Sequence, residues 1–131
     1  MGDRAMVISN DSLEDSDIPY LLEKKNFAYL LKEYSSYSGL QCPYPTYTYP
    51  CHATILTGLW PKDHGIYHNE PFDPKRTKTR WFWWADELKA MNAIEAAHSK
   101  GLKVASVTWP VTGGAKGDWV IPEIWPQKGE D

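Results

Sequence analysis

The sequence predicts an α/β fold in which parallel strands are flanked by helices. Two short apolar segments, residues 5–9 and 103–108, have the composition of buried strands. Helical patterns lie between them, over residues 19–34, 53–59 and 92–101. Because the order is strand, helices, strand, we expect both strands to lie parallel in one sheet.

The first predicted strand, Ala5 to Ser9, ends at Asn10 and Asp11. Functional groups of open α/β sheets gather at the carboxyl ends of their strands. Taken alone, however, Asp11 is also typical of a turn or a cap, since Ser and Asn residues surround it.

Two helices follow from periodicity and end signals. Residues 19–34 carry an apolar stripe that includes Leu22, Ala28 and Leu31, which predicts one amphipathic helix. Residues 92–101 end with a glycine after a lysine, as helices commonly do.

The segment from residue 44 to residue 69 places hydroxyls and an amide around a predicted helix start. Residues 53–59 have helical spacing, Gly58 suits a C-terminal end, and Pro50 is tolerated in a first turn. Thr48 then lies just before the helix, where free N–H groups and the helix dipole favour an anion or an alkoxide. No Ser-His-Asp arrangement is visible, so a metal is the favoured activator of this hydroxyl. The alternative is that Thr48 only caps the helix.

This segment resembles the nucleophile region of the nucleotide pyrophosphatase/phosphodiesterase branch of the alkaline phosphatase superfamily. The family pattern is close to Pro-Thr-x-Thr-x-Pro-Asn-His, then Thr-Gly-x-x-Pro-x-x-His-Gly-Ile, then Asn. Residues 45–52 of this chain read Pro-Thr-Tyr-Thr-Tyr-Pro-Cys-His. The resemblance favours Thr48 as the nucleophile, with Asn69 following it by 21 residues. It implies an alkaline-phosphatase-like parallel sheet flanked by helices, of which residues 1–131 are an incomplete, N-terminal portion.

The resemblance also implies a metal site. Family members hold two zinc ions, and a strand-end Asp and the nucleophilic Thr are among the ligands. Asp11 and Thr48 match these two positions, and most other ligands come from later sequence in the family. The residue after the nucleophile flanks the nucleotide base in relatives, so Tyr49 is the candidate base-stacking residue.

Asp63-His64-Gly65 looks like a late metal-binding motif of the same family. Pro61 before it and Ile66 after it match instead the turn that follows the nucleophile helix. His64 is therefore predicted to be structural.

A structural zinc site is the other use of the histidines and the two cysteines. Cys42, Cys51, His64 and His68 would supply its ligands. The cysteines are far apart for a zinc knuckle, and Gly65 weakens a helix between the histidines. We therefore do not favour this site, and two cysteines are too few for a disulfide framework.

The chain contains seven tryptophans, which is a high number for 131 residues. Four consecutive aromatic residues, 81–84, are predicted to pack rather than to stack on bases. The later run 109–114 resembles the family's Trp-Pro-Gly turn after a strand.

The charge and the apolar composition of the chain limit the kinds of partner that we expect. A net charge of −3 and a pI near 5.8 give no electrostatic case for a nucleic-acid duplex. No run of the sequence is long and apolar enough for a membrane span, and the N-terminus lacks the apolar core of a secretion signal. The cytoplasm is the default expectation for the residues present, although many relatives are exported.

The resulting hypothesis is a metal-dependent hydrolase of phosphodiester or pyrophosphate bonds. Its substrate would be a small phosphodiester or nucleotide, attacked by Thr48 while Asn69 donates a hydrogen bond to a phosphoryl oxygen. Its partner would be the remainder of the catalytic domain, without which the chain alone is expected to be inactive. The alternative is a non-catalytic phosphate-binding or assembly module that keeps only the nucleophile loop.

Overall fold

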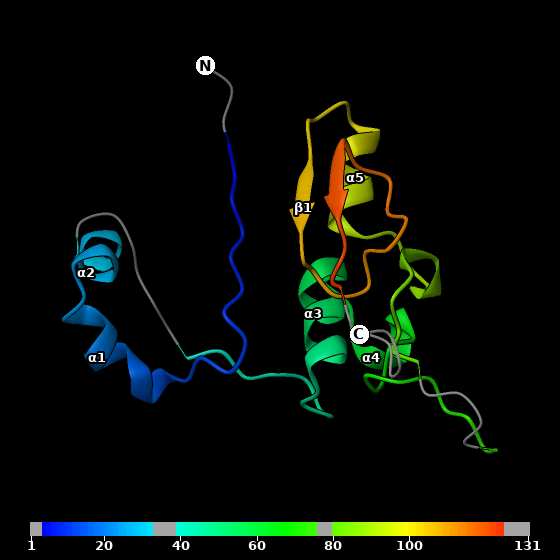
Figure 1. Cartoon of the computed structure of the whole chain (residues 1–131), viewed down its shortest axis with the longest axis horizontal. Coiled ribbons are helices and arrows are strands. Elements are labelled where there is room, and N and C mark those ends of the chain that lie inside the picture. The colour runs from blue at the N-terminus through cyan, green and yellow to red at the C-terminus, as the bar shows by residue number, and fades with distance from the viewer. Residues whose placement is uncertain (1–3, 33–38, 76–79, 125–131) are drawn as a thin grey trace, which may run out of the picture. The chain divides into compact units, whose positions relative to one another are not determined.

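The computed structural model describes residues 4–32, 39–75 and 80–124, and the chain divides into two compact units. The first unit ends at Gln41 and the second begins at Cys42. Each has helices of its own (Figure 1).

The described residues of the first unit form three short helical elements. They are η1 (Asp15–Asp17), α1 (Ile18–Leu22) and α2 (Lys25–Lys32). The single helix predicted over residues 19–34 is therefore broken, and its last two residues lie outside the described ranges. The break follows from two i→i−3 hydrogen bonds, from Glu23 N to Tyr20 O and from Lys24 N to Leu21 O, which tighten the end of α1.

The strand predicted at residues 5–9 is not formed. No ladder in the described ranges includes this segment, and the Met6, Val7 and Ile8 side chains are exposed. An apolar, β-branched run marks residues that a sheet could bury, but a strand exists only when a neighbour supplies its hydrogen bonds. The prediction was wrong here because that neighbour is a non-local requirement.

The second unit contains four helical elements and two strands in its described residues. These are α3 (Thr48–Thr57), α4 (Pro61–His64), η2 (Ala85–Glu87), α5 (Ala93–Ser99), β1 (Ala105–Val107) and β2 (Trp119–Ile121). The helix predicted over residues 92–101 is α5, with the Asn92 side chain accepting a hydrogen bond from Glu95 N and Gly101 in the left-handed region after it.

β1 and β2 pair in parallel, with Ala105 opposite Trp119 and Val107 opposite Ile121. The prediction of a strand after α5 is confirmed in a shorter form, and the α/β class with parallel pairing is confirmed with it. β2 was not predicted, because three residues carry too little pattern to separate a strand from a loop.

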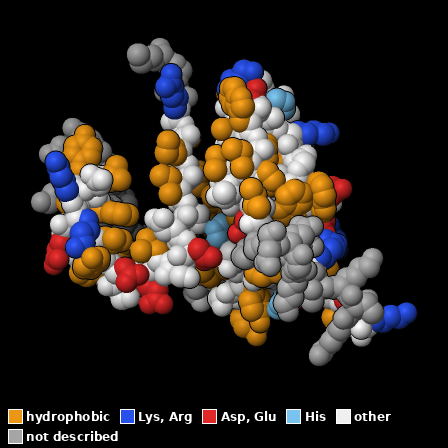
Figure 2. All heavy atoms as spheres, viewed as in Figure 1, with side chains coloured by type: hydrophobic (Ala, Val, Ile, Leu, Met, Phe, Trp, Pro, Cys, Tyr) orange, Lys and Arg blue, Asp and Glu red, His pale blue; other side chains and the backbone are white. Residues whose placement is uncertain are grey.

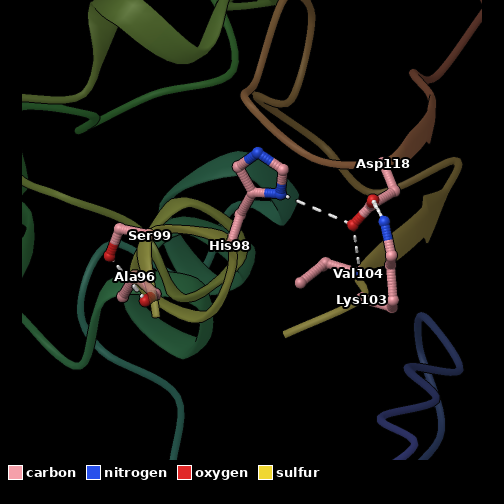
Figure 3. Close-up of polar contacts among 6 residues, drawn as sticks. All are labelled: Ala96, His98, Ser99, Lys103, Val104 and Asp118. Carbon is pink, nitrogen blue, oxygen red and sulfur yellow. Dashed lines mark hydrogen bonds and ion pairs between the residues drawn. The ribbon is translucent and has the colours of Figure 1, made fainter. Parts of the chain in front are cut away.

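Asp118 joins the ends of three elements of this unit (Figure 3). Its carboxylate accepts hydrogen bonds from Lys103 Nζ at 2.6 Å and from Val104 N at 2.9 Å, and it lies 3.4 Å from His98 Nδ1 on α5. These contacts connect the residues just before β1 and β2 to α5.

The core of the second unit gathers around the inner face of α3, where Tyr49, Ala53 and Leu56 follow one another at helical spacing. The other members are Ile66, Phe82, Leu88, Ile94 and Val111, with Trp81, Val104 and Trp109 packed at the edge. Phe82 and Trp81 thus bring the aromatic run into the core, as predicted, while Trp84 stays half exposed.

One face of the small sheet is open. Val107, Trp119 and Ile121 are each more than half exposed, and hydrophobic side chains gather over β1 and β2 on the viewed surface (Figure 2). In complete α/β domains parallel sheets are covered on both faces. Within the described ranges, no helix has the length and apolar character needed to cross a membrane.

Candidate active site

The candidate site is built on the first turn of α3. Tyr47 precedes the helix with extended backbone and makes no side-chain capping bond, and Thr48 is the first helical residue. Tyr47 rather than Thr48 is therefore the N-cap residue, and the helix starts one residue earlier than predicted, since Thr48 was expected just before it. Pro50 fits this start because the N–H that it lacks has no partner in a first turn. Gly58 ends the helix with φ 71°, as predicted.

Asn69 lies at the same helix start. Its Oδ1 accepts a hydrogen bond from the backbone N–H of Tyr49 at 3.0 Å. Two residues that are 21 positions apart, Thr48 and Asn69, are thus brought to one end of one helix. With Oδ1 engaged, the amide group of Asn69 offers its Nδ2 hydrogens for donation.

The loop that carries Asn69 is fixed on both sides. The backbone N–H of Phe82 donates to the Asn69 carbonyl at 2.9 Å. On the other side, the rings of Tyr47 and His68 lie with centroids 4.3 Å apart, and His68 Nδ1 accepts from Glu70 N at 3.2 Å. The amide of Asn69 is therefore presented by a restrained loop.

His64 has a structural role. The side chain is fully buried, its Nδ1 accepts the N–H of Ile66 at 3.1 Å, and its Nε2 lies 3.1 Å from Thr54 Oγ1. Because Nδ1 accepts, Nε2 carries the hydrogen and donates it to Thr54. Burial lowers the pKa of His64, although the nearby Asp63 acts in the opposite direction. The structure agrees with the prediction that His64 is not a ligand.

Tyr49 points into the core instead of toward a ligand. It is 0% exposed, its ring meets the Trp81 ring edge-on at 5.1 Å, and its hydroxyl donates to Glu123 Oε2 at 2.7 Å. The structure does not support the base-stacking role for Tyr49, because no face of the ring is open. Its position on the inner face of α3 explains the difference.

Asp11 belongs to the first unit and lies in a turn. Its Oδ1 accepts the N–H of Ser12, whose φ is 61°. This is the local role that the neighbouring residues favour, and metal binding by Asp11 stays a prediction.

No group of three or more His, Cys, Asp or Glu side chains that could hold a metal ion is present in the described ranges. No disulfide joins Cys42 and Cys51.

His52 and Trp109 are contacts of the site that the sequence reasoning did not assign. His52 Nδ1 lies 2.8 Å from the carbonyl oxygen of Thr48, and Trp109 Nε1 lies 3.3 Å from the carbonyl oxygen of His52. The available indication was the family pattern itself, which contains a histidine at the position of His52.

The second unit thus combines a small parallel sheet with a helix that begins at Thr48 and whose first turn is bound by the Asn69 side chain. Residues 5–131 match the family model described as type I phosphodiesterase / nucleotide pyrophosphatase, and the chain belongs to this family.

Curated relatives agree with this assignment. The chain is 36% identical to human ectonucleotide pyrophosphatase/phosphodiesterase family member 5 over 110 residues, which are 84% of this chain and 21% of that protein. It is 35% identical to rat family member 3 over 80 residues, covering 54% of this chain and 9% of the relative. Human family member 1 is 35% identical over 86 residues, covering 61% and 9%. The chain thus spans between 9% and 21% of the length of these relatives.

Proposed function

We propose that these residues supply the nucleophile segment of a hydrolase that cleaves phosphodiester or pyrophosphate bonds, with Thr48 as the nucleophile. The observation that carries the proposal is the hydrogen bond from Tyr49 N to Asn69 Oδ1, which holds an amide donor beside Thr48 at the start of a ten-residue helix. The printed names of the relatives, nucleotide pyrophosphatase/phosphodiesterase, favour diesters and pyrophosphates as substrates.

Thr48 occupies the position where a helix favours negative charge. The N–H groups of the first turn and the dipole of α3 stabilise both a bound phosphate and a deprotonated hydroxyl. In the proposed reaction Thr48 Oγ1 attacks phosphorus, an O–P bond forms, and the opposite P–O bond breaks to release the alcohol or phosphate. Water then attacks the phosphothreonine and regenerates the hydroxyl.

Asn69 is proposed to stabilise the transition state. Its Nδ2 would donate to a nonbridging phosphoryl oxygen, on which charge develops as the O–P bond forms. Because Oδ1 is engaged with Tyr49 N, the amide needs little reorganisation when substrate binds.

The described residues fit only part of a zinc site. We propose the Asp11 carboxylate and the Thr48 oxygen as two zinc donors, and zinc takes about four ligands. Zinc held there would lower the pKa of the Thr48 hydroxyl and so favour its nucleophilic form. We propose that the other ligands come from the remainder of the catalytic domain.

The test is hydrolysis of a chromogenic phosphodiester by the natural gene product that contains these residues, with zinc present. Thr48→Ala should nearly abolish turnover, because a methyl group cannot attack phosphorus, while the zinc content stays largely unchanged. Thr48→Ser keeps the hydroxyl and should keep activity. Full turnover by the Thr48→Ala variant would overturn the nucleophile assignment.

The same assay addresses the second candidate function, a non-catalytic phosphate-binding module. The incomplete metal cluster of the described residues favours this alternative. It predicts no zinc-dependent turnover by the wild-type protein, together with binding of inorganic phosphate that Asn69→Ala weakens.

A further inference from the structure

The side chain of His52 contacts the backbone of Thr48. His52 is only 8% exposed, and its Nδ1 lies 2.8 Å from the Thr48 carbonyl oxygen. Since a carbonyl oxygen only accepts, Nδ1 must carry the hydrogen. This is the opposite tautomer to that of His64, whose Nδ1 accepts.

Trp109 holds His52 in place from the turn after β1. Its indole N–H donates to the His52 carbonyl at 3.3 Å, and the two rings meet edge-on with centroids 5.3 Å apart. Trp109 is itself restrained, because Thr112 Oγ1 donates to its carbonyl at 2.6 Å. The Trp-Pro turn is thereby linked to the first residue of α3 through a single side chain.

We propose that His52 is a positioning residue for Thr48, and that Trp109 supports it in this role. The inference rests on the proposed function. Helix ends fray, so the direction of a hydroxyl on the first residue depends on how well the first turn is held. The bond from Nδ1 to the Thr48 carbonyl restrains the backbone of that residue, and a displacement of about 1 Å at a reacting group can cost on the order of 10²-fold in rate.

Three variants separate positioning from packing. His52→Asn places an amide N–H close to the position of Nδ1, whereas His52→Gln places it close to Nε2 and His52→Ala removes it. In the phosphodiester assay with the natural gene product, we expect His52→Asn to keep kcat within a few fold, and His52→Gln and His52→Ala to lose about 10- to 100-fold in kcat with little change in KM.

Packing alone predicts a different order. Gln fills more of the space beside Trp109 than Asn does. If packing alone matters, the Tm and the activity of His52→Gln should therefore equal or exceed those of His52→Asn. Equal losses of kcat in the Asn and Gln variants would overturn the proposal. Thr48→Ala belongs in the same series: if it stays active, the nucleophile assignment fails, and if it is inactive while Asn and Gln behave alike, only the role of His52 fails.

A readout that does not need activity is the tautomer of His52. Ring ¹⁵N chemical shifts should show the hydrogen on Nδ1 of His52 and on Nε2 of His64 in the same spectrum, so His64 is an internal control. An Nε2–H tautomer at His52 would overturn the proposal, even if every variant failed to fold.

Discussion

Three threonines lie on α3, and their hydroxyls have different surroundings. Thr57 Oγ1 donates back to the Ala53 carbonyl at 2.7 Å, and Thr54 Oγ1 pairs with His64 at 3.1 Å. Thr48 differs because it is the first residue of the helix, where the dipole favours an anion. The position on the helix, rather than the residue type, is therefore what favours Thr48 as the proposed nucleophile.

Asn69 is expected to act through its donor group. Asn69→Ala should lower kcat/KM for a phosphodiester by on the order of 10²-fold or more, the usual cost of losing one preorganised donor. The measurement is steady-state hydrolysis with zinc present.

Asn69→Asp is the matched variant for this prediction. Aspartate keeps an oxygen that can accept the Tyr49 N–H, so the helix start should stay formed, but it has no amide hydrogen to donate. Wild-type activity in Asn69→Asp would show that the donor is not used.

The pairing of Thr48 with Asn69 could be anticipated from the motif, but the burial of Tyr49 could not. The latter depends on Glu123, 74 residues away, and on the edge-on contact with Trp81. Neither partner is visible in the pattern around the nucleophile. The side-chain contact of His52 with Thr48 was also missed, because only the folded turn gives the ring nitrogen its direction.

At the scale of elements, the features that depend on nearby residues were predicted better than those that depend on distant pairing partners. α5 was predicted because the lysine and glycine that close it lie in the local sequence. The start of α3 was predicted one residue late, because Thr48 was expected just before the helix and is its first residue, a difference that end signals do not resolve. β2 and the unformed strand at residues 5–9 depend on pairing partners, which a local pattern does not contain.

The junction at Asp118 predicts a specific dependence on pH. Its hydrogen bond from Lys103, reinforced by the Val104 N–H, lowers the pKa of Asp118 from 3.8 to about 2. The folded state therefore binds this proton less readily than the unfolded state does. The stabilisation is present above pH 3.8 and is lost as the pH falls toward 2.

Asp118→Asn should lower stability at neutral pH and should flatten the pH dependence between pH 4 and 2. Asn cannot pair with Lys103 as an ion, and it presents an amide where two oxygens accept now. The check is denaturant unfolding followed from pH 7 to pH 2, with Asp86→Asn as the control because Asp86 is exposed in η2. Parallel stability curves for wild type and Asp118→Asn would contradict the prediction.

At the scale of the whole molecule, the small sheet has an open apolar face. The open face of β1 and β2 exposes Val107, Trp119 and Ile121, although parallel strands are normally covered. Within the described ranges, no group of three or more His, Cys, Asp or Glu side chains could hold a metal ion. The open face agrees with a chain that spans about a fifth of human family member 5.

Zinc binding by the 131-residue chain should therefore be weak. The two oxygen ligands that we propose, from Asp11 and Thr48, would leave about two of four zinc positions without a protein donor, so calorimetry should give no submicromolar binding. Submicromolar binding that is lost in Cys51→Ser would instead point to a site made by cysteine and histidine. Zinc-dependent turnover of a phosphodiester by this chain alone would show that its own residues complete the metal site, and the proposed need for further ligands would be wrong.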